Sequence, residues 1–323
     1  MRIFVAGASG VIGTRLIPRL IDRGHEVVGT FRSPASAERV RALGAEPVQL
    51  DVLDPRAVRE AVLEAAPDAI VHQATALADV RFSRRLDRSF AQTNRLRTEG
   101  TDALLAAARE AGVPRFVAQS YASLRYAREG GAVKTEEDRL DPTPVPTTRE
   151  TNAAMRHLDQ AVTDAGGIAL RYGGFYGAAN DGLIEPVRKR QLPIVGDGGG
   201  VSSFVHLDDA AVATVLALER GQTGIYNIVD DHPAPVREWL PVLAEALGAK
   251  PPRRVPVWLA RVVAGDAAVM LGTEARGASN AKARRELGWE LRYPSWREGF
   301  TAAYAPAPTA TALRGADLQR RLA

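Results

Sequence analysis

Short apolar runs alternate with helical patterns through the first 120 residues, and this alternation constrains the fold more than any other feature of the chain. The runs are RIFVAG, EVVGTF, PVQLD, DAIVHQA and RFVAQS, and a sixth, GIALRYG, follows later. The helical segments between them end near a glycine, as at Gly24, Gly44 and Gly112. Strands that alternate with helices of this length are joined by right-handed crossovers. The pattern therefore predicts an α/β fold with a doubly wound parallel sheet.

The regular alternation of strands and helices ends after about residue 174. Gly/Pro-rich loops such as GDGGGVSS and AKPPRRVP separate shorter elements, which predicts a smaller C-terminal lobe over the carboxyl edge of the sheet. We expect residues 1–174 to form the main domain and residues 175–305 to form mainly a substrate-binding lobe. Within the second part, residues 203–228 are expected to return to the main body as a strand and a helix. Residues 306–323 are Ala/Pro-rich and are expected to form a tail.

Composition excludes several classes of protein. With 46% hydrophobic and 25% charged residues the chain is typical of a globular protein. No apolar run approaches the roughly 18 residues of a membrane span, and MRIFVAG leads directly into a strand, without room for a signal peptide. The absence of cysteine fits a cytoplasmic location and excludes thiolate metal sites, and the five histidines lack paired metal spacing. The basic residues are scattered, so we expect no nucleic-acid, membrane or metal partner.

The sequence GASGVIG places three glycines, Gly7, Gly10 and Gly13, between the first strand and the first helix. Glycine permits a tight turn and a close approach of the backbone, and the free N–H groups at a helix start can meet a pyrophosphate. A purely structural turn is the alternative. The other residues of this predicted nucleotide-binding loop are Ser9, Val11 and Ile12.

Two later strand ends bear on the choice of nucleotide. Arg32 and Ser33 follow the second strand, at the place where an acidic residue would bind the adenosine ribose of NAD. A guanidinium suits the 2′-phosphate of NADP instead, so we expect NADP(H) to be preferred over NAD(H); a solvated loop charge is the alternative for Arg32. Asp51, followed by Val52, ends the third strand and is placed to bond the adenine amine or to cap the next helix.

Seven segments, in order, resemble the extended short-chain dehydrogenases/reductases, which are related to nucleotide-sugar epimerases and dehydratases. They are GASGVIG, LDVLD, VHQAT, TNRLRTEGT, RFVAQS, LRYGGFYG and SFVHLDDAA, and they cover roughly residues 1–300. The resemblance implies a Rossmann-like, NAD(P)-binding domain in residues 1–174. It also implies that Gln73, Ala74 and Thr75 line the cofactor ribose and phosphates. The residues that it implies at the nicotinamide amide are Gly173, Gly174 and Phe175.

The catalytic pair of this family is missing. Members carry a tyrosine four residues before a lysine on one helix face, and the lysine lowers the pKa of the phenol so that it can exchange a proton near neutrality. Alignment puts Thr147 and Thr151 at these positions, and no Tyr-x-x-x-Lys occurs anywhere in the chain. Ser120 and Tyr121 fall where the third catalytic group is expected. They are the candidate catalytic residues, although we favour Tyr121 as a wall beside the nicotinamide over a proton donor.

A ketone beside a phenolic hydroxyl can supply its own proton, and positioning accounts for much of the rate of hydride transfer. The sequence therefore predicts an NADPH-dependent ketoreductase of secondary metabolism that acts on a hydroxylated aromatic ketone and takes the proton from substrate or water. It would be similar to the angucyclinone ketoreductase of simocyclinone biosynthesis, which also lacks the pair. A nucleotide-sugar epimerase or reductase and a non-catalytic NADP-binding redox sensor are the alternatives. The family resemblance also implies a possible homodimer through the helices at about 94–111 and 148–165.

Overall fold

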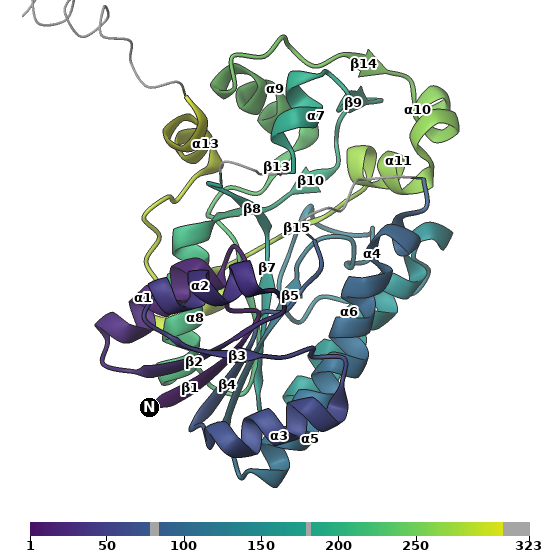
Figure 1. The fold of residues 1–323 in the computed structure, drawn as a ribbon. Coiled ribbons are helices and arrows are strands. Elements are labelled where there is room, and N and C mark those ends of the chain that lie inside the picture. Colours follow the sequence, from purple (N-terminus) through teal and green to yellow (C-terminus); the bar gives the residue numbers. More distant parts are fainter. Residues whose placement is uncertain (78–83, 179–181, 306–323) are drawn as a thin grey trace, which may run out of the picture.

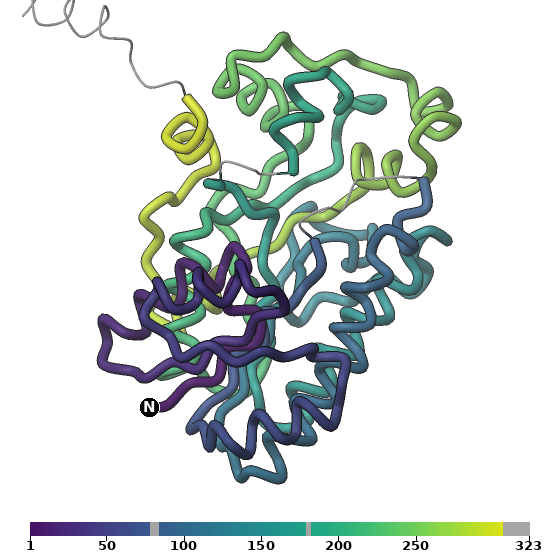
Figure 2. Tube along the Cα trace, in the orientation of Figure 1, coloured from purple at the N-terminus to yellow at the C-terminus, as the bar shows by residue number. Residues whose placement is uncertain are grey.

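The computed structural model describes residues 1–77, 84–178 and 182–305, so the tail expected at 306–323 lies outside the described residues. A central sheet and its helices form a lower body, and a lobe of shorter elements lies above the sheet (Figures 1 and 2). The segment drawn in purple and blue builds most of the body, and green segments build most of the upper lobe.

The central sheet has seven parallel strands in the order β3-β2-β1-β4-β5-β7-β12. They are β1 (Arg2–Ala6), β2 (Glu26–Phe31), β3 (Glu46–Gln49), β4 (Ala69–His72), β5 (Arg115–Tyr121), β7 (Ile168–Tyr172) and β12 (Gly224–Ile228). Strands β4 and β7 are buried along their whole length because helices cover both faces of the sheet, which is why they are mainly apolar. The predicted doubly wound α/β fold is confirmed. The strand order reverses between β1 and β4, where ligands bind in open sheets of this kind.

Helices form one layer on each face of the sheet (Figure 1). The first layer contains α1 (Gly13–Asp22), α2 (Pro34–Ala42) and α8 (Leu207–Arg220). The second contains α3 (Pro55–Ala65), α5 (Thr101–Glu110) and α6 (Arg149–Asp164), with α4 (Leu86–Arg95) packed against α6. A five-residue π-helix, η1 (Leu96–Gly100), joins α4 to α5, and a short 3₁₀ turn, η2 (Pro146–Thr148), precedes α6.

The upper lobe has its own apolar core around Tyr176, Phe204 and Trp239. It is built mainly from α7 (Ile184–Arg188), α9 (Val236–Ala246), α10 (Val257–Ala264), α11 (Asp266–Thr273) and α13 (Trp296–Tyr304). Short paired strands complete it: β8 (Gly174–Tyr176) with β11 (Phe204–His206), β9 (Ile194–Val195) with β14 (Arg254–Val255), and β10 (Val201–Ser202) with β13 (Ala234–Pro235). Three further elements lie outside this core: the paired strands β6 (Val133–Lys134) and β15 (Gly277–Ala278), and helix α12 (Ala281–Leu287).

A buried carboxylate attaches the C-terminal segment to the body. Asp230 follows β12, and its two oxygens accept hydrogen bonds from the backbone N–H groups of His232 at 3.2 Å and Trp296 at 2.8 Å. The side chain is almost fully buried, and burial raises the pKa of Asp230 to about 7. The native protein therefore holds a proton here to a higher pH than the unfolded chain does.

This proton gives a testable pH dependence. Between about pH 4 and pH 7 the native state binds more protons than the unfolded state at Asp230, so this group lowers the free energy of unfolding as the pH rises through that window. The slope amounts to about 1.4 kcal/mol per pH unit at most. Urea unfolding at pH 5 and pH 7.5 should show the loss in the natural chain and a smaller loss in Asp230→Asn. An equal loss in both proteins would contradict the prediction, and Asp22→Asn on the surface is the control.

Candidate cofactor and active site

The glycine loop has no room for side chains at two of its three glycines. Gly7 has φ of +90°, and a Cβ there would lie 2.7 Å from the backbone nitrogen of Ala74. A Cβ at Gly13 would lie 2.3 Å from the carbonyl oxygen of Ala8. The glycines therefore let the loop pack directly against the end of β4 and the start of α1.

The outer side of the loop offers free hydrogen-bond donors. Gly10 and Val11 are exposed, and no side chain caps the start of α1 at Ile12. Among the described residues, none accepts a hydrogen bond from the backbone N–H groups of Val11 or Ile12. Ser9, which lies between Gly7 and Gly10 in the loop, is half-buried. Unpaired N–H groups at a helix start fit the diphosphate of a dinucleotide, so the residues present suit that cofactor.

Two arginines, Arg32 after β2 and Arg39 on α2, bear on the cofactor site. Arg32 is exposed and makes no hydrogen bond or ion pair with any other described residue, while the neighbouring Ser33 bonds the hydroxyl of Ser36 at 2.9 Å. Arg39 on α2 reaches the carbonyl oxygen of Ser9 at 3.5 Å, and the sequence interpretation missed it. An arginine on an exposed helix face carries no sequence signal that separates it from a solvated charge.

The N-cap of α3 is Asp54, whose carboxylate accepts from the N–H groups of Arg56 and Ala57. The alternative of Asp51 as that cap is therefore wrong. Asp51 lies three residues earlier, is exposed, and accepts a hydrogen bond from the N–H of Leu53 at 3.0 Å. Its carboxylate stays beside the carboxyl edge of the sheet, while Val52 turns into the core.

The segment after β4 is held partly by its own side chains. Gln73 is buried and donates from Nε2 to the hydroxyl of Tyr172 at 3.2 Å, and Tyr172 bonds the hydroxyl of Thr214 at 2.6 Å. The Gln73 side chain is thus directed into the body. Ala74 and Thr75 are half-buried beside the glycine loop.

The residues after β7 connect the body to the upper lobe. The N–H of Gly174 donates to the carbonyl oxygen of Ser203 at 2.8 Å, and a Cβ at Gly173 would lie 2.8 Å from that same oxygen. Phe175 is half-buried, and its ring centroid lies 5.2 Å from that of Tyr172. Close backbone packing between the β7–β8 junction and the start of β11 therefore requires glycine at position 173.

Ser120 and Tyr121 end β5, and both are tied to local structure. The buried hydroxyl of Ser120 accepts a hydrogen bond from Nη1 of Arg125 at 3.1 Å. Burial raises the pKa of the Tyr121 phenol, and the hydroxyl of Ser123 and the charge of Arg97 offset this only in part. Tyr121 therefore stays protonated at neutral pH, without the activated phenol that proton exchange would need.

Thr147 and Thr151, which align with the catalytic Tyr and Lys of the family, have different surroundings. Thr147 lies in η2, and its buried hydroxyl has no hydrogen-bond partner in the described structure. Thr151 lies in the first turn of α6, where its hydroxyl donates to Asp87 at 2.7 Å and accepts from Asn94 at 3.2 Å. The hydroxyl of Thr151 is therefore committed to joining α4 and α6.

No lysine replaces the missing one. Lys134 pairs with Asp138 at 3.3 Å, Lys189 with Glu185 at 3.1 Å, and Lys282 donates to the carbonyl oxygen of Ile225 at 3.0 Å. Lys250, the fourth lysine of the chain, is exposed after α9 in the upper lobe. The site thus has no free ammonium group.

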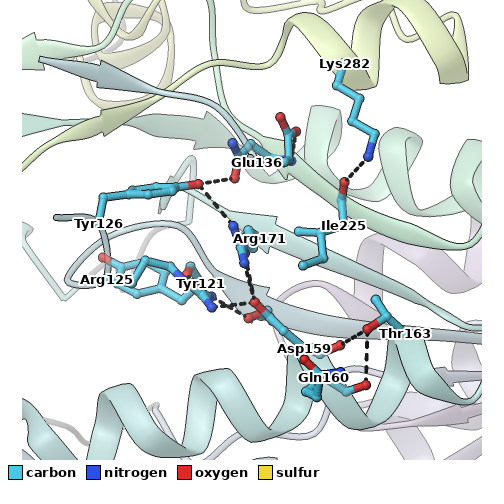
Figure 3. Close-up of polar contacts among 12 residues, drawn as sticks. Tyr121, Arg125, Tyr126, Glu136, Asp159, Gln160, Thr163, Arg171, Ile225 and Lys282 are labelled. Atoms are coloured by element: carbon cyan, nitrogen blue, oxygen red, sulfur yellow. Dashed lines mark hydrogen bonds and ion pairs between the residues drawn. The ribbon is translucent and has the colours of Figure 1, made fainter. Parts of the chain in front are cut away.

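Two buried arginines, Arg125 and Arg171, share one buried carboxylate (Figure 3). The carboxylate of Asp159 on α6 accepts from Arg125 and, at 2.8 Å, from Arg171 on β7. Burial alone would raise the pKa of Asp159, but the two guanidinium charges hold it below its usual value. Arg171 also donates to the hydroxyl of Tyr126 at 3.4 Å, which donates to Asn227 at 2.8 Å. The only sequence signal for this network was Arg171, a charge inside the apolar run IALRY.

Comparison with known proteins identifies the family. A model of the NAD dependent epimerase/dehydratase family matches residues 3–229, which include the glycine loop and all seven strands of the sheet. The chain belongs to this family. It is an NAD(P)-dependent oxidoreductase of the extended short-chain dehydrogenase/reductase type.

Two relatives in the epimerase/dehydratase family are reductases by name. The chain is 43% identical over 308 residues to a 3-diazoavenalumate denitrifying reductase from a Streptomyces species, with 93% of this chain and 99% of the relative covered. It is 30% identical over 322 residues to a 4-hydroxy-2-methyl-3-oxo-4-farnesyl-3,4-dihydroquinoline-1-oxide ketoreductase from Stigmatella aurantiaca, with 90% and 92% covered. The family resemblance and the reductase activity expected from the sequence are confirmed at this level.

A solved structure of the same family supports the fold. The Thermus thermophilus UDP-glucose 4-epimerase in complex with NAD superposes with a TM-score of 0.69 at 25% identity, covering 98% of this chain and 100% of the epimerase. The UDP-glucose 4-epimerase of Thermotoga maritima, at 21% identity, has the same fold with a TM-score of 0.73. Among the described residues, no helix is long and apolar enough to cross a membrane, and no group of three metal-ligating side chains occurs.

Proposed function

We propose that the chain is an NADPH-dependent reductase of hydroxylated aromatic substrates in secondary metabolism, and that its acceptor is a diazo group beside a phenolic oxygen. The observation that carries the proposal is the combination of a fitting dinucleotide loop with a site that offers neither an activated tyrosine nor a free lysine. The relative with 43% identity is named for the removal of nitrogen from a diazo compound.

The chemistry of a diazo acceptor explains why no proton donor is needed. When bound, NADPH supplies a hydride to the ring carbon that carries the diazo group. The C–N bond of the substrate breaks with its electron pair, dinitrogen leaves, and the neighbouring ring oxygen remains as a phenolate. No alkoxide forms, and a phenolate is stable enough in water to take its proton from solvent later. A tyrosine–lysine pair would have no proton to deliver in this reaction.

The protein would then contribute binding, orientation and charge. The glycine loop holds the diphosphate, and the wall formed by Tyr121 orients the flat ring without giving up its proton, because burial raises the pKa of that phenol. Thr151 is occupied by Asp87 and Asn94 and takes no part.

A carbonyl acceptor is the second candidate, and it is the reaction that the sequence predicts. The relative named as a ketoreductase of an oxidised quinoline favours it. An internal hydrogen bond from a neighbouring phenolic hydroxyl would polarise the ketone and supply the proton. The resemblance to the angucyclinone ketoreductase, which also lacks the Tyr–Lys pair, suggests the same chemistry. Both candidates share the cofactor, the aromatic substrate and the absence of a protein donor.

A labelled-substrate assay separates the candidates. The protein is incubated with 4-deuterated NADPH and either an ortho-diazophenol bearing ¹⁵N, an ortho-hydroxyaryl ketone, a quinone or UDP-glucose. We expect ¹⁵N₂ release and deuterium on the ring carbon, at a rate well above that of the Gly7→Ala variant, which controls for uncatalysed reduction. Deuterium at a carbinol carbon would favour the ketone reaction. NADPH oxidation with none of these acceptors would contradict the proposal.

The preference for NADP(H) rests on Arg32, and it has its own test. Arg32→Ala should weaken NADPH binding by roughly tenfold or more, through loss of a charge-assisted phosphate contact, and should leave NADH binding unchanged. Fluorescence titration with both cofactors measures this. Arg41→Ala is a matched control, since Arg41 lies on α2 and pairs with Glu38. Equal losses for NADPH and NADH would contradict the assignment.

A further inference from the structure

Among the described residues, Arg97 is a buried cation without an ion-pair partner. It lies in the π-helix η1, and its side chain is 4% exposed. Its Nε and Nη1 atoms are buried and make no hydrogen bond, and within the described parts of the chain no carboxylate lies within ion-pair distance of it. Burying a charge without a partner is costly, so a protein keeps one mainly where a ligand completes it.

The neighbours of Arg97 compensate its buried charge only in part. Burial, and after it the positive charge of Arg125, lower the pKa of Arg97 to about 10, and the charges of Tyr121 and Asp159 offset this only in part. The carboxylate of Asp159 is already shared by Arg125 and Arg171, and that of Asp87 accepts from Thr151. Among the described residues Arg97 therefore has no carboxylate of its own, and an anion would neutralise its buried charge.

Arg97 lies near the carboxyl ends of β4 and β5, since the ring of His72 at the end of β4 bonds the backbone of the adjacent Leu96. Its charge acts on Tyr121 at the end of β5 and on His72 at the end of β4, and open α/β sheets bind ligands at these carboxyl ends. Asn94, three residues earlier, donates a hydrogen bond to Thr151, which aligns with the catalytic lysine of the family. Arg97 therefore follows directly after the segment that contacts this position. Short π-helices occur frequently at functional sites, and η1 is one.

We propose that Arg97 is the anion receptor of the active site and binds the phenolate oxygen of the hydroxylated aromatic substrate. This inference rests on the proposed function and names the group that recognises its substrate. The guanidinium donates to the ring oxygen, and it stabilises the negative charge that remains there once the hydride has added and the leaving group has departed. Arg97 thus supplies, from another helix, the positive charge that the Thr151 position lacks.

The first test measures binding without turnover. The protein saturated with NADP⁺ is titrated with 4-nitrophenol, whose anion absorbs visible light, at a pH at which the free ligand is mainly neutral. We expect the natural chain to bind it as the anion and to develop the phenolate band. Arg97→Met should lose the band and bind about tenfold or more weakly, the usual effect of losing a hydrogen bond to a charged group, and Arg97→Lys should restore part of it.

Matched ligands and a matched variant sharpen this test. Arg95→Met removes an exposed guanidinium that pairs with Glu99 on the same segment, and it should behave like the natural chain. 4-Nitroanisole, which cannot ionise, should bind the natural chain and Arg97→Met equally. Unchanged nitrophenol binding in Arg97→Met, or no nitrophenol binding by the natural chain, would overturn the proposal. A loss of NADPH affinity in Arg97→Met would also overturn it, since the anion would then be a cofactor phosphate.

Thermal unfolding separates an anion receptor from an arginine that only supports the fold, because the two roles predict opposite changes in the Tm of Arg97→Met. Arg97→Met removes an unpaired buried charge and keeps the length of the side chain, so the Tm should rise by about 2 °C or more. A fall in Tm would show that Arg97 supports the fold and would contradict the proposal. If the natural chain binds nitrophenolate through Arg97 but reduces no diazophenol or ketone, the proposed function fails and the anion site stands. If Arg97→Met reduces the diazophenol as fast as the natural chain, the anion receptor fails and the function stands.

Discussion

Replacement of Asp159 by Asn is expected to lower the free energy of unfolding by about 3–5 kcal/mol, the cost of removing one partner from a buried ion pair. The carboxylate of Asp159 is almost fully buried and accepts from both Arg125 and Arg171. An amide keeps the shape of the side chain and removes its charge, so two buried guanidiniums lose their counter-ion. No other single change in the network of Figure 3 leaves two charges uncompensated.

Urea unfolding followed by circular dichroism measures the loss. Asp102→Asn is the matched control, because Asp102 on α5 pairs with His157 at 2.7 Å on the surface. An exposed pair contributes about 0–1 kcal/mol. Comparable losses in the two variants would show that the Asp159 carboxylate is not the counter-ion on which its buried neighbours depend.

The second large effect is expected at Gly7, where alanine should abolish measurable NADPH binding and destabilise the fold. The backbone has φ of +90°, which costs a non-glycine residue about 1–3 kcal/mol. The new Cβ would also lie 2.7 Å from the backbone nitrogen of Ala74, so the loop must move away from β4. That movement would displace the N–H groups that fit the diphosphate.

Gly24→Ala separates the effect of backbone strain from the effect of the clash with the backbone of Ala74. Gly24 has φ of +78°, and a Cβ there would meet nothing within 4 Å, so alanine pays the backbone strain without a clash. Calorimetric titration with NADPH and thermal unfolding should show a modest loss of stability and normal binding for Gly24→Ala. If Gly7→Ala also binds NADPH normally, the close approach of the loop to β4 is unimportant for the cofactor.

The sheet could be predicted because its signals are local. Six apolar runs bounded by Gly, Pro or polar residues all form strands, with ends that differ by one or two residues from those expected. The two-residue strands of the upper lobe could not be predicted in the same way. Strand β9 exists only because it pairs with β14, which lies some 60 residues further along the chain, and no short window of sequence contains that information.

The site was only partly accessible from sequence for a similar reason. The glycine loop has a fixed spacing, so it could be placed from sequence, whereas Arg97 lies in a segment whose other arginine, Arg95, is exposed. Whether Arg95 or Arg97 is buried depends on the π-helix η1 and on the packing of α4 against α6. The N-cap of α3 shows a smaller limit: Asp51 and Asp54 both precede the helix, and only the backbone decides that Asp54 caps it.

The seventh strand has a consequence for any attempt to divide or recombine this protein. Strand β12 completes the sheet only after the chain has entered the upper lobe through β8, left it through β11 and followed α8 along the body. A fragment that ends after β7 would expose the edge of β7 as an unpaired surface prone to aggregation. Exchange of the substrate-recognition region between relatives would therefore need two separate inserts, one on each side of α8 and β12, in place of a single junction.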